Sequence, residues 1–101
     1  MTISVNYNQS DDKASIIIGG DFNFDQSAEF RTILHELSNK SAEIIIDMAM
    51  VTNIDSSALG MLLLLREKCG AGGAPIKIIK TTPEIFDVMK MANFHTLFDL
   101  E

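Results

Sequence analysis

No segment of this sequence limits the possible folds more than its three consecutive isoleucines, Ile44, Ile45 and Ile46. β-Branched residues favour extended backbone, and an unbroken apolar run is typical of a central strand that is covered on both faces. The run ends at Asp47, and the mostly apolar residues 48–54 are predicted to form a connection packed under the domain. The rest of the chain must therefore supply neighbouring strands and covering helices.

The residues before this run predict a hairpin followed by a helix. Residues 3–7 alternate between apolar and polar side chains, as on a half-buried strand, and residues 14–19 form the expected second strand, ended by Gly19 and Gly20. From residue 25 the apolar spacing changes to i, i+3, i+4, i+7, which predicts a helix with one buried stripe. The residues of that stripe are Phe30, Ile33, Leu34 and Leu37.

The residues after the run predict two further helices and a strand. An apolar helix is expected over residues 57–69, closed by the glycines at 70, 72 and 73, and a strand over residues 76–80. The sequence Thr82-Pro83-Glu84 is typical of a helix start, since it combines a capping hydroxyl with proline at the first helical position. We therefore predict an α/β fold, a single compact domain over residues 1–101 in which three to four helices cover a mixed β-sheet.

The charge and the cysteine content of the chain exclude several classes of function. The 101 residues include 8 Lys and Arg against 14 Asp and Glu, which gives a formal net charge of -6. Binding to nucleic acid or to an anionic membrane surface needs clustered basic residues, so neither partner is expected. A single cysteine, Cys69, rules out an internal disulfide, and no Cys/His spacing predicts a metal site or a cofactor. Because no apolar run is long enough to span a bilayer, a cytoplasmic protein is predicted.

The segment Asn53–Gly60 is the candidate functional site. Either Asp55 or Ser56 is predicted to cap the helix, which puts Ser57 at its first or second position. Backbone N–H groups there lack an intrahelical partner, and the helix dipole favours an anion. A phosphate on Ser57, with about 1.5–2 negative charges, would therefore be tolerated by the fold while it changes the surface. Gly60, one turn further on, leaves room for a partner to approach.

The helix that follows Ser57 is apolar on almost all sides. A helix that covers a sheet needs only one apolar stripe, so some of Met61, Leu64 and Leu65 are expected outside the core. An exposed apolar patch beside a serine that can be modified indicates a protein-binding surface. Two simpler interpretations stay open: that Asp-Ser-Ser only begins a helix, and that neighbouring helices bury these side chains as well.

A serine hydrolase is a further alternative, because His35 and His95 are available as partners for Ser57. The Gly-x-Ser-x-Gly turn of such enzymes is absent, however, and each histidine is expected to be a surface or packing residue. Asp47 and Asp55 lack a third ligand, so they give little support for a metal ion. We therefore predict that the chain is not an enzyme.

The serine segment and its surroundings resemble the signature of a known family. From Ile44 to Arg66 the chain is similar to STAS domains, and specifically to bacterial anti-sigma factor antagonists. In that family an apolar strand ending in Asp precedes Asp-Ser-Ser-Gly-Leu-Gly at a helix start. Here the motif is Asp55-Ser56-Ser57-Ala58-Leu59-Gly60. Residues 20–23 resemble the family's turn before its first helix, and residues 91–98 its closing segment, so the similarity spans essentially the whole chain.

The resemblance implies a protein that switches between partners. Its unmodified form would bind an anti-sigma factor with serine kinase activity and so free a sigma factor. That kinase would phosphorylate Ser57 and release the antagonist, and a metal-dependent serine phosphatase would restore it. The surface expected to bind the partner comprises Asn23, Asp55, Ser56, Ala58, Gly60, Met61 and Leu64.

Two positions depart from the family's pattern. Ala58 replaces the usual glycine and adds a methyl group where a partner should come close, and Asn23 stands where aspartate is more frequent. Both leave the choice of partner open, as does the question whether Ser56 is modified as well as Ser57. STAS domains also occur on anion transporters and in stress-signalling complexes. The alternative function is therefore a signalling scaffold that regulates an enzyme or a receptor rather than a sigma factor.

Overall fold

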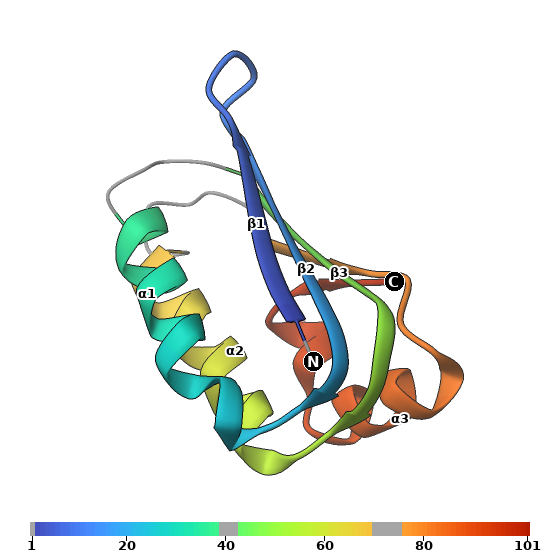
Figure 1. The fold of residues 1–101 in the computed structure, drawn as a ribbon. Coiled ribbons are helices and arrows are strands. Elements are labelled where there is room, and N and C mark those ends of the chain that lie inside the picture. The colour runs from blue at the N-terminus through green and yellow to red at the C-terminus, as the bar shows by residue number, and fades with distance from the viewer. Residues whose placement is uncertain (1, 39–42, 70–75) are drawn as a thin grey trace.

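Five strands form one mixed sheet in the computed structural model, which describes residues 2–38, 43–69 and 76–101 (Figure 1). The order across the sheet is the order along the chain. The first pair of strands is antiparallel and the other three pairs are parallel. The strands are β1 (Thr2–Asn8), β2 (Lys13–Phe22), β3 (Glu43–Ile54), β4 (Ile76–Ile79) and β5 (Asp99–Leu100).

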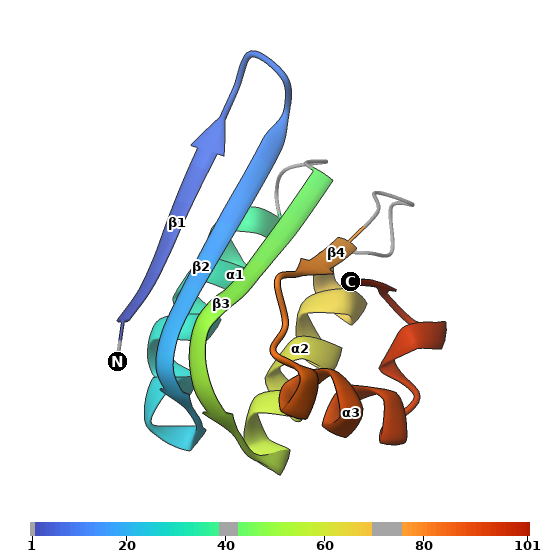
Figure 2. The ribbon, with the colours of Figure 1, turned by 90° about the vertical axis from the view of Figure 1, so that its right-hand side faces the viewer.

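Three α-helices connect the parallel strands. Figures 1 and 2 show the first two side by side on one face of the sheet, with the third below the short strand β4. Each parallel connection leads to the next strand in the same direction, and right-handed crossovers of that kind put successive helices on one face. The helices are α1 (Ser27–Ser38), α2 (Ser56–Cys69) and α3 (Pro83–Met91), with short 3-10 turns η1 (Phe24–Gln26) and η2 (Phe94–Thr96). The predicted α/β fold is confirmed. The glycines predicted to close α2 lie outside the described residues.

Two strands run further than the sequence predicts. Residues 48–54, predicted as a connection, continue β3, and β2 passes through Gly19 and Gly20 to end at Phe22. The pairing of β2 with β3 continues past the glycines, with one register shift before Gly19 and another after Gly20. Gly20 adopts a positive φ of 79°, which glycine tolerates. The prediction that the glycine pair ends the strand is therefore wrong. Both strands curve together toward the lower end of the molecule in Figure 2.

The core lies between the sheet and the two helices α1 and α2. The predicted α1 stripe is confirmed, because its four apolar residues are the buried residues of that helix. α2 contributes a stripe at similar spacing. The sheet contributes the side chains of its inner face, among them Ile16, Ile18, Ile44, Ile46 and Ile78, each at most 1% exposed.

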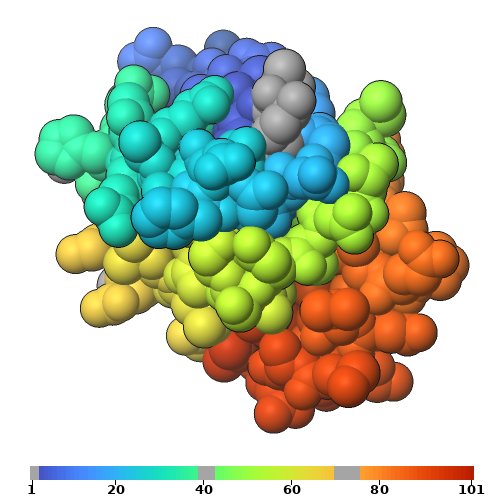
Figure 3. Space-filling model, turned by 60° about the horizontal axis from the view of Figure 1, so that its bottom comes forward, coloured from blue at the N-terminus to red at the C-terminus, as the bar shows by residue number. Residues whose placement is uncertain are grey.

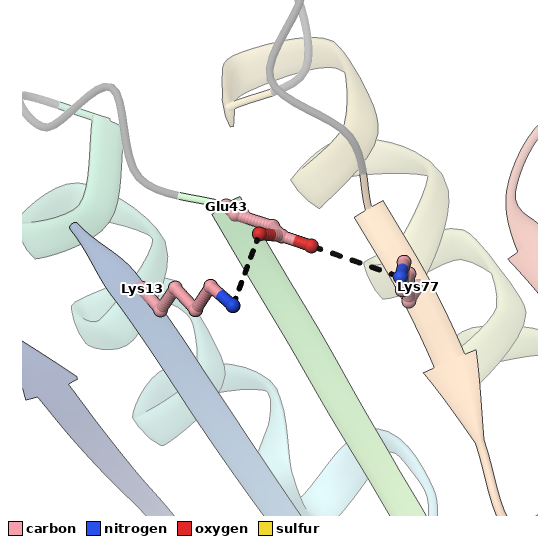
Figure 4. Close-up of polar contacts among 3 residues, drawn as sticks. All are labelled: Lys13, Glu43 and Lys77. Carbon is pink, nitrogen blue, oxygen red and sulfur yellow. Dashed lines mark ion pairs between the residues drawn. The ribbon is translucent and has the colours of Figure 1, made fainter. Parts of the chain in front are cut away.

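The opposite face of β1–β3 carries no helix in the part of the chain that the structure describes (Figure 2). Ile45 points to this face and is only half-buried, so the prediction of a strand covered on both faces is wrong. The reason is topological, since crossovers in one direction leave one face bare. Glu43 on this face lies 3.8 Å from the ammonium groups of Lys13 and Lys77, which joins three neighbouring strands by ion pairs (Figure 4).

Candidate functional site

Ser57 lies at the second position of α2, two residues after the residue that caps the helix. The cap is Asp55, because its Oδ1 accepts the backbone N–H of Ala58 at 2.9 Å and its carbonyl accepts the N–H of Leu59 at 3.2 Å. Ser56 is exposed at the first helical position. The structure thus selects Asp55 from the two caps that the sequence left open.

The hydroxyl of Ser57 is held by the same carboxylate. Ser57 Oγ donates to Asp55 Oδ1 at 2.6 Å, a short, charge-assisted hydrogen bond. This bond, with a smaller contribution from the N–H of Ala58, lowers the pKa of Asp55 from its ordinary value. The carboxylate is therefore ionised at neutral pH, and it orients a hydroxyl that is neither sealed in the core nor fully exposed.

A groove runs beside Ser57 between the starts of α1 and α2. We call it the serine groove, and Figure 3 shows the blue-green surface of η1 and α1 meeting the yellow-green surface of α2 on this side. Its volume is about 210 Å³. One wall comes from η1 and α1, namely Phe24, Ser27 and Arg31, and the other from α2, namely Ser57, Gly60, Met61 and Leu64. The structure therefore brings four of the predicted site residues together.

The wall from η1 and α1 was not predicted from the sequence. Phe24 is 68% exposed, although it is a large aromatic residue next to a groove. It follows Asn23, which forms a capping box for η1: the Asn23 side chain accepts the N–H of Asp25, and the Gln26 side chain accepts the N–H of Asn23, both at 2.9 Å. The sequence did contain a signal for this wall: an aromatic residue that directly follows a cap and lies outside the buried stripe of the helix is expected at the surface.

Asn23 and Asp55 line a second, more polar hollow on the other side of the Asp55 cap. The loops that carry them follow the ends of β2 and β3, which are neighbours in the sheet. Asp21 links the ends of these two strands, since its Oδ1 accepts the Asn53 amide at 3.2 Å and the Thr52 hydroxyl at 3.3 Å. The predicted residues Asn23, Asp55 and Ser57 thus lie at one end of the molecule.

Ala58 does not contribute to the surface expected to bind the partner. Its side chain is fully buried, so the prediction that its methyl group meets an approaching partner is wrong. The methyl lies in the buried stripe of α2, which begins at this residue. Of the three residues expected in part outside the core, Leu65 is fully buried, Met61 is 7% exposed and only Leu64 is half-buried. Leu63, which was not singled out, is 41% exposed.

The remaining candidates for chemistry are not assembled into a site. His35 and His95 are both exposed, as expected for surface residues. Residues 2–38, 43–69 and 76–101 contain no group of three His, Cys, Asp or Glu residues that could hold a metal ion. Cys69 is buried, and burial raises the pKa of its thiol. Within the described ranges, no helix is long and apolar enough to cross a bilayer.

Comparison with known proteins identifies the family. The family model described as "Mlab, STAS domain" matches residues 5–99. The chain belongs to the STAS domain family. A STAS-domain containing protein of Pseudomonas aeruginosa is 35% identical to it over 86 residues, which cover 85% of each chain. The predicted resemblance of the chain to this family is thereby confirmed.

Solved structures with the same fold include anti-sigma factor antagonists. One from Mycobacterium paratuberculosis has a TM-score of 0.80 at 16% identity, covering 98% of this STAS domain and 85% of that chain. The antagonist SpoIIAA in its unphosphorylated form has a TM-score of 0.74 at 14% identity, covering 89% and 83%. Bacillus SpoIIAA in its phosphorylated form has a TM-score of 0.76 at 14% identity, covering 99% and 91%. At these identities the likeness concerns the fold.

Proposed function

We propose that this STAS domain is a cytoplasmic anti-sigma factor antagonist that works by partner switching and has no enzymatic activity of its own. Its unphosphorylated form binds an anti-sigma factor with serine kinase activity and frees a sigma factor. Phosphorylation of Ser57 by that kinase blocks binding, and a metal-dependent serine phosphatase reverses it. The neighbours named as anti-sigma factor antagonists, one of them known in a phosphorylated form, support this proposal.

One observation carries the proposal: Ser57 lines a groove whose opposite wall carries an exposed aromatic residue, Phe24. Protein interfaces commonly centre on an aromatic side chain that becomes buried on binding, surrounded by residues that exclude water. A partner that buries Phe24 in this way also covers Ser57. The modification site and the docking surface are therefore the same place.

Phosphorylation at this place changes the surface enough to block docking. Transfer of the γ-phosphoryl group of ATP to Ser57 Oγ forms the new P–O bond, leaves ADP and releases the hydroxyl proton. The product carries about 1.5–2 negative charges beside the ionised carboxylate of Asp55. Burying this pair of like charges under a partner costs several kcal/mol unless the partner supplies matching cations. The unmodified hydroxyl carries no such cost.

The same geometry gives no support to a serine hydrolase. The Ser57 hydroxyl donates to a carboxylate, whereas a hydrolase nucleophile is activated by a base, usually histidine, which a third group orients. A signalling scaffold that regulates an enzyme or a receptor would use the same docking surface. The identity of the protein that binds there separates this alternative from an anti-sigma factor antagonist.

The test begins with protein isolated from its native cells. Phosphosite mapping by mass spectrometry should find phosphate on Ser57, and the co-purifying protein should be an anti-sigma factor with a kinase domain. Calorimetry with that partner should then give equal affinity for wild type and Ser57→Ala. Protein with phosphoserine at position 57 should bind at least about 100-fold more weakly, as an uncompensated buried charge requires.

The adjacent serine provides the matched control. Ser56 is exposed and does not line the serine groove, so Ser56→Ala should still be phosphorylated at Ser57, and phosphorylation should weaken its partner binding by the same factor as in wild type. Equal partner affinity for the unmodified protein and the protein phosphorylated at position 57 would contradict the proposal. Co-purification of an enzyme or receptor without any anti-sigma factor would favour the scaffold.

A further inference from the structure

Arg31 is the one charged side chain among the described residues that line the serine groove. It projects from α1, whereas Ser57 belongs to α2, and the two helices are neighbours. The Arg31 side chain is exposed and forms no ion pair within the described ranges. A cation is therefore available on the wall opposite the proposed modification site.

Of the two sides of Ser57, the groove is the more favourable one for a phosphate. Phosphorylation removes the proton that Ser57 donates to Asp55, so this carboxylate changes from a hydrogen-bond acceptor into a repelling neighbour. The N–H of Ala58 already donates to the same carboxylate. A phosphate dianion is thus repelled on the side of the cap and attracted on the side of the groove, where Arg31 lies.

We infer that Arg31 is the internal partner of the phosphate on Ser57, and that the pair closes the serine groove. The guanidinium group matches phosphate through two parallel N–H···O bonds, which a single ammonium group cannot form. This inference rests on the proposed phosphorylation of Ser57 and adds to it a second residue from another helix. It applies to this chain because both side chains face one groove.

An Arg31–phosphate pair would block the partner in two ways. The negative charge of the phosphate and Asp55 that one guanidinium leaves unneutralised still opposes docking, and the arginine side chain fills the space above Gly60 that the unmodified protein leaves open. A Cβ atom added at Gly60 meets nothing within 4 Å, which shows how much room exists there. The switch then needs one side chain to move and no change of fold.

The test needs no kinase or partner. Phosphoserine is incorporated at position 57 during translation in wild type and in Arg31→Gln, and the second ionisation of the phosphate is followed by 31P NMR against pH. A nearby cation favours the dianion, so the pKa of the phosphate should be lower in wild type than in Arg31→Gln by about half a pH unit or more. Arg31→Lys, which keeps the charge, should restore part of the difference.

A second cation provides the control. Lys68 lies further along the same helix pair, in a hollow that it shares with Arg31, but it does not line the serine groove. Lys68→Gln should leave the pKa of the phosphate unchanged. The side-chain NMR signal of Arg31 Nε should move on phosphorylation of wild type, and the amide spectrum of unmodified Arg31→Gln should show that this variant folds.

Three results would overturn the inference: equal phosphate pKa values in wild type and Arg31→Gln, equal effects of Lys68→Gln and Arg31→Gln, or an Arg31 signal that does not respond to phosphorylation. The proposed function fails differently. It fails if Ser57 carries no phosphate in cells or if phosphate does not weaken partner binding. Neither result changes how Arg31 responds to a phosphoserine installed beside it.

Discussion

Asp55 has two roles at the residue scale, because one carboxylate caps α2 and also holds the Ser57 hydroxyl. The pKa of Asp55 is lowered in the folded protein, mainly by the bond from Ser57. A group with a lowered pKa stabilises the fold above its unfolded pKa, and this contribution is lost as the pH falls through the folded value. The stabilising effect of Asp55 is therefore present at neutral pH and disappears in acid, below its ordinary pKa of 3.8.

We expect Asp55→Ala to lower the melting temperature at pH 7 by about 5 °C, the scale of a lost N-cap in a domain of this size. Asp55→Asn is the matched control, since asparagine caps a helix as well as aspartate but does not titrate. The melting temperature of Asp55→Asn at pH 7 should be close to that of wild type. In acid it should fall less steeply with decreasing pH, because the contribution of Asp55 to that fall is gone. Thermal unfolding followed by circular dichroism between pH 2 and pH 7 measures both. An unchanged melting temperature for Asp55→Ala would show that the cap contributes nothing.

The residues of the site divide into those that the sequence predicts and those that it cannot. Asp55, Ser57 and Gly60 belong to one contiguous motif, so local spacing is enough to find them. Phe24 and Arg31 reach the same groove from η1 and α1, and only the packing of these elements beside α2 brings them there. A pattern that repeats within one helix carries no information about which residue of a second helix lies opposite.

At the element scale, α2 shows why an almost wholly apolar helix is hard to interpret. Its buried residues, Ala58, Met61, Leu62, Leu65 and Cys69, follow helical spacing. Because further leucines, Leu59, Leu63 and Leu64, lie between them in the first half of the helix, more than one apolar stripe fits the sequence. The sequence therefore places α2 correctly along the chain but leaves its rotation undetermined. The same uncertainty explains the incorrect prediction for Ala58.

Two neighbouring leucines of α2 test its rotation. Leu62 is fully buried, and Leu63 is 41% exposed. We expect Leu62→Ala to lower the free energy of unfolding by about 2–5 kcal/mol, because it leaves a cavity in the core. Leu63→Ala should cost less than about 1 kcal/mol. Urea unfolding of the two variants measures the difference, and equal losses would contradict the orientation of this helix.

The strands β2 and β3 illustrate a second limit at this scale. The prediction that Gly19 and Gly20 end β2 follows from the usual effect of glycine on strands. In the structure the partner strand β3 keeps pairing beyond them, and two register shifts, each with an extra residue on β3, let the ladder continue past the glycines. Whether a glycine ends a strand or bends it depends on the length of the neighbouring strand, which local sequence does not give.

At the scale of the whole molecule, helices cover one face of β1–β3, and the other face is held together at the surface by ion pairs. Glu43 pairs with Lys13 and Lys77, whose side chains are 48% and 40% exposed. Exposed pairs of this kind contribute about 0–1 kcal/mol each, because water and salt screen them. The stability of the fold therefore comes from the inner face, and the outer face is free to vary.

We expect Glu43→Gln to lower the free energy of unfolding by less than about 1 kcal/mol at low salt. In about 1 M NaCl the difference from wild type should vanish, since the screening length falls to about 3 Å. Denaturant unfolding at the two salt concentrations measures both values. A loss above about 2 kcal/mol, or one that salt does not reduce, would show that this carboxylate has a structural role beyond its ion pairs.

The continued pairing of β2 with β3 has a consequence for how a signal is read. The loops that carry Asn23 and Asp55 follow the paired ends of β2 and β3, so they cannot separate unless hydrogen bonds between these two strands break. Under the proposed function, both states of the protein then share one shape, and a partner must distinguish them by local charge at the moment of contact. A protein of this kind can acquire a new partner by replacing single groove residues, while its backbone stays unaltered.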